Sequence, residues 1–230
     1  MKAVSVVTVM FLALGLTQAL GQETPIPQTE YAPPSGKGRV VVMISGQSGP
    51  INYIPIAKDI AKAGYYVVLV DGNDIWKKDG EDRFKGVVAR AQQSPQALPG
   101  KVGVVGFSLG GGPALAYAAN EPDLVAAVVV GYPLTNYITD PTSFVAHRIK
   151  VPTVMLAAVH DADKNCCMID MARKLAAAAK AGSEPFELTE YPNAKHGFNL
   201  RGEGNYREQD AADAFARTLA HLKKYLAPPA

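Results

Sequence analysis

Short apolar runs recur along this chain, and segments with a helical spacing of apolar residues separate them. The runs have the length of β-strands, and most are almost continuously apolar, as is typical of strands covered on both faces. Strands are therefore predicted over residues 39–44, 65–70, 101–105, 125–130, 152–159 and 186–191.

The segments between these runs have the periodicity of amphipathic helices. Helices are expected near residues 53–63, 82–93, 108–119, 166–181 and 205–226. Gly182 is expected to end the fourth of these helices, and the proline-containing stretch 131–150 is predicted to be irregular. Strands that alternate with helices predict an α/β fold with a mainly parallel central sheet and helices on both faces.

The N-terminal residues resemble a targeting segment. Lys2 precedes an apolar run over residues 4–16, and small residues follow up to Gly21. This pattern predicts a signal peptide over residues 1–21, and therefore an exported protein that is periplasmic or secreted. An uncleaved N-terminal membrane anchor is the alternative, although the run is shorter than the roughly 20 apolar residues of a membrane span.

Residues 22–38 contain four prolines and are predicted to be an extended leader or a short edge segment. The remaining residues, 39–230, have the length of one α/β domain. They contain no obvious long insertion that would form a separate lid.

Composition narrows the class of partner. The chain has 230 residues, of which 48% are hydrophobic, and 23 basic residues nearly balance 21 acidic ones. Such a chain can build a large core. It has no basic stripe or acidic tail, so nucleic acid is not an expected partner, and a membrane is expected only if the N-terminal anchor is retained. The oligomeric state is left open.

A Gly-x-Ser-x-Gly pentapeptide, Gly106 to Gly110, lies between a predicted strand and a predicted helix. In this setting a serine can be held on a tight turn with its hydroxyl exposed at the edge of the sheet. The pentapeptide alone is a weak signal, and its position between strand and helix strengthens it. Ser108 is therefore the predicted nucleophile of a serine hydrolase.

The chain also supplies an acid and a base in the order that this chemistry uses. The strand over 152–159 is followed by His160, Asp161 and Asp163, and the strand over 186–191 is followed by His196. Reactive groups of parallel sheets gather at the carboxyl ends of strands, so these side chains can converge on Ser108. His196 is the predicted base. Asp161 is the favoured acid, and Asp163 is either the alternative acid or a cap of the next helix.

A hydrolase of this type also needs N–H donors for the oxyanion of its tetrahedral intermediate. The backbone N–H groups of Leu109, at the start of a helix, and of Gln47, in the first loop, are the predicted donors. Gly46 and Gly49 allow the backbone of that loop to come close to a substrate.

Other residues that could take part in chemistry have weaker support in the sequence. His147 and His221 are expected to be surface or structural residues, whereas His160 is the rival to His196 as base. His160, Asp161, Asp163, Cys166 and Cys167 lack the spacing of known zinc motifs, so no metal site is predicted. No phosphate-binding glycine loop is present, and no cofactor is predicted.

The chain has two cysteines, Cys166 and Cys167, and they are adjacent. Two alternatives are open. They are buried thiols at the start of a helix, or they form a disulfide that closes a small, strained and therefore labile ring.

The chain resembles the dienelactone hydrolase family of α/β-hydrolases in residues 106–111, in the stretch from Val151 to Asp161 and in residues 191–198. The resemblance implies the α/β-hydrolase fold, and it favours Asp161 because the acid of this fold commonly lies nine residues after the proline that opens its strand, here Pro152. Dienelactone-cleaving members have a cysteine as nucleophile and bind an anionic substrate with arginines. Here Ser108 occupies the nucleophile position, and Arg83 and Arg201 are either substrate-binding candidates or solvated surface residues.

These features together predict an exported serine esterase that cleaves small or soluble carboxylic esters through an acyl-enzyme on Ser108. A peptidase or acyltransferase with the same catalytic triad is one alternative. A ligand-binding protein that has this fold without turnover is another.

Overall fold

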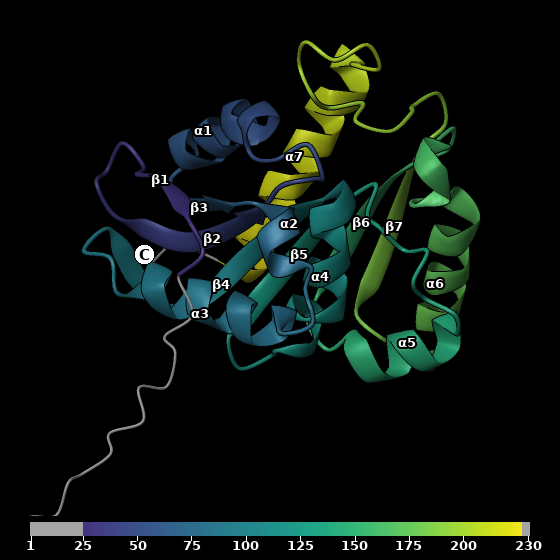
Figure 1. Cartoon of the computed structure of the whole chain (residues 1–230), viewed down its shortest axis with the longest axis horizontal. Helices are drawn as coiled ribbons and strands as arrows, with labels where there is room; N and C mark the ends of the chain where they lie inside the picture. Colours follow the sequence, from purple (N-terminus) through teal and green to yellow (C-terminus); the bar gives the residue numbers. More distant parts are fainter. Residues whose placement is uncertain (1–24, 227–230) are drawn as a thin grey trace, which may run out of the picture.

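The computed structural model describes residues 25–226, so the predicted signal peptide lies outside the described residues. Seven strands form one sheet in the order β1-β3-β2-β4-β5-β6-β7 (Figure 1). Their bounds are β1 Gln28–Tyr31, β2 Gly38–Ile44, β3 Tyr66–Val70, β4 Ala97–Phe107, β5 Val125–Gly131, β6 Thr153–Ala158 and β7 Phe186–Tyr191. Only β1 is antiparallel to its neighbour. The predicted mainly parallel sheet is confirmed, and part of the predicted leader is the edge strand β1.

Helices cover both faces of this sheet. The α-helices are α1 Ile54–Lys62, α2 Gly72–Ile75, α3 Gly80–Gln92, α4 Gly111–Ala116, α5 Pro141–Arg148, α6 Ile169–Gly182 and α7 Glu208–Tyr225. Short 3-10 turns are η1 Ile51–Tyr53, η2 Ser108–Gly110, η3 Ala118–Asn120 and η4 Asp163–Asn165. None of the helices within the described part of the chain is long and apolar enough to cross a membrane.

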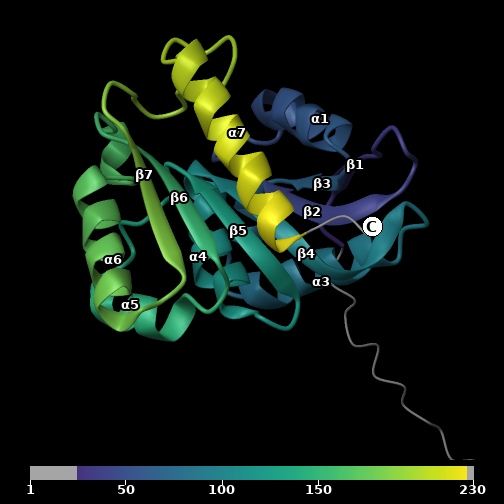
Figure 2. The same cartoon turned by 180° about the vertical axis from the view of Figure 1, so that it is seen from behind.

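Two apolar cores result, one on each face of the sheet. On one face α1 and α7 pack against residues such as Val41 and Val129, and Figure 2 shows α7 lying across the middle of this face. On the other face α3, α4, α5 and α6 pack against residues such as Val42 and Val128. The β-branched, continuously apolar strands form because both of their faces are covered.

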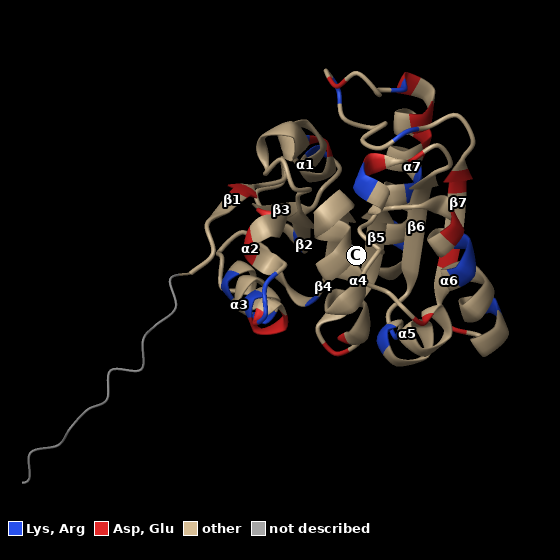
Figure 3. Ribbon diagram, turned by 45° about the vertical axis from the view of Figure 1, so that its right-hand side comes forward, with Lys and Arg blue, Asp and Glu red and all other residues tan. Residues whose placement is uncertain are grey.

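Acidic and basic residues are interspersed on the outer helices in the view of Figure 3, for example along α3. One ion pair, Arg173 to Glu190 at 2.7 Å, joins α6 to β7. These charges lie on the surface, where such a pair contributes little to stability.

The chain changes direction within the sheet between β2 and β4. From β2 it crosses to β3 on one side, and it then returns to β4 on the other side. The loops after β2 and β4 therefore separate, and a crevice at the carboxyl ends of the strands is the usual result. This is where the loop with Gln47 and the turn with Ser108 lie.

The helix predictions need three corrections. The stretch predicted to be irregular contains α5, because Asp140 accepts a hydrogen bond from the Ser143 N–H at 3.0 Å and Pro141 occupies the first helical position. The helix predicted from residue 166 begins at Ile169, and Gly182 is its last residue rather than its stop. The helix after Ser108 begins as a 3-10 turn and ends at Ala116.

Candidate active site

Ser108 lies on a sharp turn at the end of β4. Its φ of 51° is in the left-handed region, which a non-glycine residue rarely adopts. Glycines on both sides make the turn possible. A Cβ on Gly106 would lie 2.5 Å from the Gly110 carbonyl oxygen, and a Cβ on Gly110 would collide with the Ile44 carbonyl oxygen. The turn therefore requires both glycines of the pentapeptide.

Three side chains from separate strand ends meet at this turn. The Ser108 hydroxyl donates to His196 Nε2 over 2.8 Å, and His196 Nδ1 donates to Asp161 Oδ2 over 2.7 Å. Ser108 follows β4, Asp161 follows β6 and His196 follows β7. A serine, an imidazole and a carboxylate in one hydrogen-bonded chain form the arrangement that activates a serine hydroxyl.

The two candidate acids differ in their contacts. The Asp161 side chain is fully buried, and its other oxygen accepts the Asp163 N–H at 3.1 Å. The Asp163 carboxylate is 43% exposed and lies 3.8 Å from His196 Nε2. Asp163 does not cap α6, whose N-cap position is Met168. The geometry therefore favours Asp161 as the partner of His196 Nδ1.

Further contacts position His196. Asn205 Nδ2 donates to the His196 carbonyl oxygen at 3.0 Å. The ring of Tyr132 packs edge-on against the imidazole, with the ring centroids 4.8 Å apart. Burial raises the pKa of Tyr132 well above its ordinary value, so this phenol stays neutral. Its hydroxyl donates to Asn199 Oδ1 at 2.7 Å.

The predicted oxyanion donors belong to two segments near Ser108: Leu109 follows it in the chain, and Gln47 lines the same cavity. The N–H of Leu109 is in the first turn of η2, where N–H groups have no intrahelical partner. Gln47 is held from the side by Asn73, whose Nδ2 donates to the Gln47 carbonyl oxygen at 3.0 Å. Gly46 must be glycine, because a Cβ there would collide with the Tyr53 hydroxyl and lie 3.1 Å from Ser108 Cβ.

A cavity of about 710 Å³ opens over these residues. Both Ser108 and His196 line it, and so does Gln47. Most of its remaining lining residues are polar, and the basic members are Lys164 and Lys195. Lys164 Nζ donates to Gln47 Oε1 at 3.2 Å and so joins the loop of the acid to the loop after β2. The remaining lining residues are Ser48, Asn52, Tyr53, His160, Ala162, Asp163, Gly197, Leu200, Glu203, Gly204 and Asn205.

The arginine candidates do not reach this cavity. Arg83 pairs with Asp79 at 2.5 Å at the start of α3 and is not among the lining residues. Arg201 lines a second cavity of about 290 Å³, and its guanidinium lies 3.9 Å from Asp59. Neither arginine lines the cavity at Ser108, and their interpretation as substrate ligands stays a prediction.

The other three histidines lie in different parts of the fold. His160 lines the cavity, and its backbone N–H donates to the Ala194 carbonyl oxygen at 3.0 Å. His147 is exposed on α5. His221 is buried on α7 and donates from Nε2 to the Pro152 carbonyl oxygen at 3.0 Å.

Sequence reasoning missed Asn73 and Tyr132. Asn73 follows the strand β3 in the stretch Asp71 to Asp74, and Asp71 Oδ1 accepts its N–H at 2.9 Å as a helix cap. The position of such a residue after a parallel strand is the signal that could have found Asn73. The sequence has no comparable signal for Tyr132, because only the folding of the chain brings this residue next to His196.

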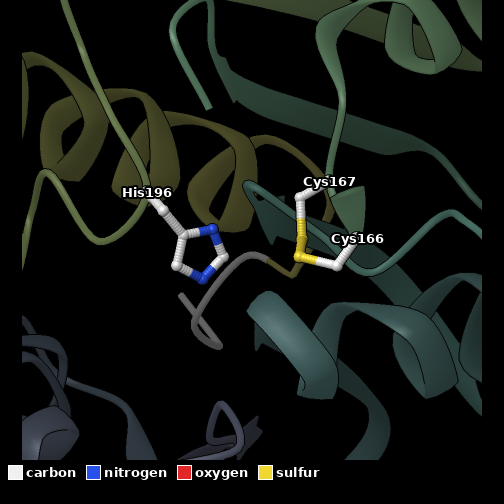
Figure 4. A group of neighbouring side chains, drawn as sticks. All are labelled: Cys166, Cys167 and His196. Carbon is white, nitrogen blue, oxygen red and sulfur yellow. A yellow bond between two sulfur atoms is a disulfide. The ribbon is translucent and has the colours of Figure 1, made fainter. Parts of the chain in front are cut away.

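Cys166 and Cys167 are joined by a disulfide, so the alternative of two buried thiols is wrong. Their sulfur atoms and a ring nitrogen of His196 lie within 4.8 Å of one another (Figure 4). Metals bind cysteine as the thiolate, and sulfurs bonded to each other offer none. In this redox state the cluster is not built for a metal.

A parallel sheet with helices on both faces and a serine on a sharp turn after a central strand defines an α/β-hydrolase. Residues 27–226 match the model of the dienelactone hydrolase family. The chain therefore belongs to the dienelactone hydrolase family, a family of hydrolases.

Individual proteins are similar to this chain in sequence or in fold. Protein usf of Aquifex pyrophilus is 34% identical over 145 residues, which cover 62% of this chain and 59% of that protein. The structure of a candidate dienelactone hydrolase from Klebsiella pneumoniae superposes with a TM-score of 0.71, at 21% identity, over 87% of this chain and 93% of that one. Esterase 2 of Thermogutta terrifontis, solved after phosphonylation by cyclosarin, gives a TM-score of 0.65 at 17% identity, over 86% and 88%.

Proposed function

We propose that this protein hydrolyses carboxylic esters of small or soluble substrates through an acyl-enzyme on Ser108. One observation carries the proposal, namely the unbroken hydrogen-bonded chain from Asp161 through His196 to Ser108, with separations of 2.7 and 2.8 Å. A serine hydroxyl is a weak nucleophile at neutral pH, and an adjacent imidazole activates it.

In the first half of the reaction the Ser108 oxygen attacks the ester carbonyl while His196 Nε2 takes the hydroxyl proton. The carboxylate of Asp161 stabilises the imidazolium that forms. The N–H groups of Leu109 and Gln47 receive the oxyanion, and one such donor is worth about 10²–10³ in rate. The intermediate then expels the alcohol, which takes the proton from His196.

In the second half water attacks the acyl group on Ser108. His196 Nε2 now takes a proton from the water and returns it to the serine oxygen as the acid product leaves. The same base, acid and oxyanion donors serve both halves.

The cavity supports the choice of substrate class. Most of its lining residues are polar, its surface is about equally polar and apolar, and it is open at the carboxyl ends of the strands. Among the described residues no lid domain covers it. Ser108 in place of the cysteine of dienelactone-cleaving members favours a general carboxylic ester, and an esterase is among the proteins with the same fold.

The protein is further proposed to act after export, in the periplasm or outside the cell. The support is the N-terminal pattern of Lys2, the apolar run and the small residues up to Gly21. Fractionation of cells that express the full chain tests this proposal, together with N-terminal sequencing of the mature protein. A cytosolic protein that keeps Met1 would contradict it.

Labelling with a fluorophosphonate probe tests the serine chemistry. The wild-type protein is expected to react and to hydrolyse short p-nitrophenyl esters, whereas Ser108→Ala should do neither. A purified, folded protein that is inert to both the probe and these esters would overturn the proposed function.

A further inference from the structure

The Cys166–Cys167 disulfide lies against the ring of His196 rather than in a distant part of the fold (Figure 4). Both sulfur atoms lie within 4.8 Å of a ring nitrogen of that histidine. Both cysteines are buried, with exposed fractions of 9% and 5%. The disulfide is therefore part of the immediate surroundings of the imidazole.

The backbone of Cys166 is tied to the turn of the nucleophile. Its carbonyl oxygen accepts the N–H groups of Thr135 and Asn136 at 2.8 and 3.1 Å. One residue earlier in the same loop, the Leu134 N–H donates to the Ser108 carbonyl oxygen at 2.7 Å. A displacement of Cys166 would therefore reach the backbone of Ser108 through a single loop.

The disulfide is also connected to the acid. The Cys166 N–H donates to the Asp163 carbonyl oxygen at 2.9 Å. The Asp163 N–H in turn donates to the Asp161 carboxylate at 3.1 Å. Two hydrogen bonds thus link the disulfide to the carboxylate that holds His196. The disulfide therefore lies near His196 and is linked to Ser108 and Asp161 through hydrogen bonds of the intervening backbone.

A disulfide between adjacent residues contributes little to the global stability of the fold. Disulfides stabilise a fold mainly by closing long loops in the unfolded chain, and this one closes almost none. Its consequence is therefore local, in the position of the residues around it.

We propose that the Cys166–Cys167 disulfide is a redox-cleavable positioning element for His196, and that its oxidised form is the one that supports efficient catalysis. This inference rests on the proposed function of the Ser108 site. The reductant is a dithiol. Its two sulfurs form a disulfide, the Cys166–Cys167 bond breaks, and each cysteine sulfur gains a hydrogen as a thiol.

Cleavage changes the surroundings of His196 in two ways. Unbonded sulfur atoms need more separation than bonded ones, and in this buried place they displace their neighbours. A thiol beside an imidazole can also transfer its proton to it and form a thiolate–imidazolium pair. Among the described residues, the titratable groups in contact with His196 include the carboxylates of Asp161 and Asp163 and the neutral phenol of Tyr132, and Lys164, Lys195, His160, Tyr53 and Glu203 line the same cavity. A new thiolate would add negative charge there and hold the proton on the base.

The test compares the wild-type protein before and after treatment with dithiothreitol, with thiols counted by alkylation and mass spectrometry. Reduction is expected to lower kcat by about tenfold to a hundredfold, the range of a small misplacement of catalytic groups, with little change in KM. The acid limb of the pH–rate profile should move to higher pH, and reoxidation should restore both. The thermal unfolding midpoint should change little, which separates positioning from global stability.

The double variant Cys166→Ala/Cys167→Ala is the matched control, and its activity should not respond to dithiothreitol. Unchanged kcat and pH profile in wild-type protein with two alkylated cysteines would overturn the inference. NMR titration of the His196 imidazole gives a readout that needs no turnover. If neither redox state hydrolyses esters, the proposed function fails, and the titration then tests the positioning of His196 by itself: a shift to higher pH on reduction supports it, and no shift overturns it.

Discussion

Asp161 and Asp163 lie two residues apart and have the same carboxylate group. Their surroundings give them different roles. Asp161 is buried with its oxygen 2.7 Å from His196 Nδ1, whereas Asp163 is partly exposed and lies 3.8 Å from Nε2. A buried carboxylate at Nδ1 fixes the tautomer in which Nε2 can accept the serine proton. The acid role in this account therefore belongs to Asp161.

Replacement of each aspartate by asparagine tests this assignment. Asp161→Asn should lower kcat by about 10⁴, because the amide favours the wrong imidazole tautomer. Asp163→Asn removes only a partly exposed charge, worth about 1 kcal/mol or less, and should cost no more than about fivefold. Steady-state kinetics on a p-nitrophenyl ester measures both. Equal losses would contradict the assignment.

At this scale the sequence predicts which side chains meet where their position after a strand decides it. Ser108, Asp161 and His196 each follow a strand, so their convergence could be predicted from the order of the strands. Tyr132 could not be found in this way, because its contact with His196 joins residues 64 positions apart through the packing of loops. The role of the disulfide could not be found either, since adjacency alone left its redox state open.

At the scale of elements, one glycine in a strand and one in a helix have opposite requirements for space. A Cβ on Gly106, at the end of β4, would meet the Gly110 carbonyl oxygen at 2.5 Å and the Ala114 Cβ at 2.8 Å. A Cβ on Gly86, within α3, would meet no atom within 4 Å.

Alanine at each position should therefore have opposite effects on stability. Gly106→Ala should lower the free energy of unfolding by about 1–3 kcal/mol, because the turn and α4 must shift. Gly86→Ala should raise it by about 0.5–1 kcal/mol, because alanine is the better helix former. Urea denaturation measures both values. A stable, fully active Gly106→Ala protein would show that the turn is less tightly packed than described.

The differences between the predicted and the observed helices have local causes. Pro141 was interpreted as a breaker, although proline at the first helical position, after the Asp140 cap, begins α5. The predicted start of α6 at residue 166 adds residues 166–168 to the helix. Those residues belong to the disulfide segment, and the helix begins only at Ile169.

The pH dependence of the free energy of unfolding tests the environment of His221 on α7. Burial lowers its pKa from the ordinary value of 6.5, so the folded protein takes up its proton at lower pH than the unfolded chain does. The unfolded state binds more protons in that window, and the free energy of unfolding falls as pH decreases from about 6.5 toward the lowered pKa. Below both values the loss is complete, and above both it is absent.

The variant His221→Gln removes this titration and keeps a donor for the Pro152 carbonyl oxygen. Urea denaturation at pH 7.5 and at pH 5 should show a smaller drop in stability for the variant than for the wild-type protein. An identical drop in the two proteins would mean that His221 is protonated as easily in the folded state as in the unfolded one.

At the scale of the whole molecule, alternating apolar runs and helical segments sufficed to predict the α/β class and the parallel sheet. The cavity could not be predicted, because contacts between distant segments shape it. Asn52 Nδ2, for example, donates to Glu203 Oε1 at 2.9 Å across 151 residues of chain. The substrate class therefore rests on the structure of these loops, whereas the reaction type rests on residues that the sequence already indicated.

The central claim is that turnover passes through an acyl group on Ser108, and rapid-quench mass spectrometry with a p-nitrophenyl ester tests it most directly. The account predicts an acyl adduct on the peptide that contains Ser108 during steady-state turnover, and neither adduct nor turnover in Ser108→Ala. Ester hydrolysis that persists in Ser108→Ala, or an adduct on another residue, would contradict it.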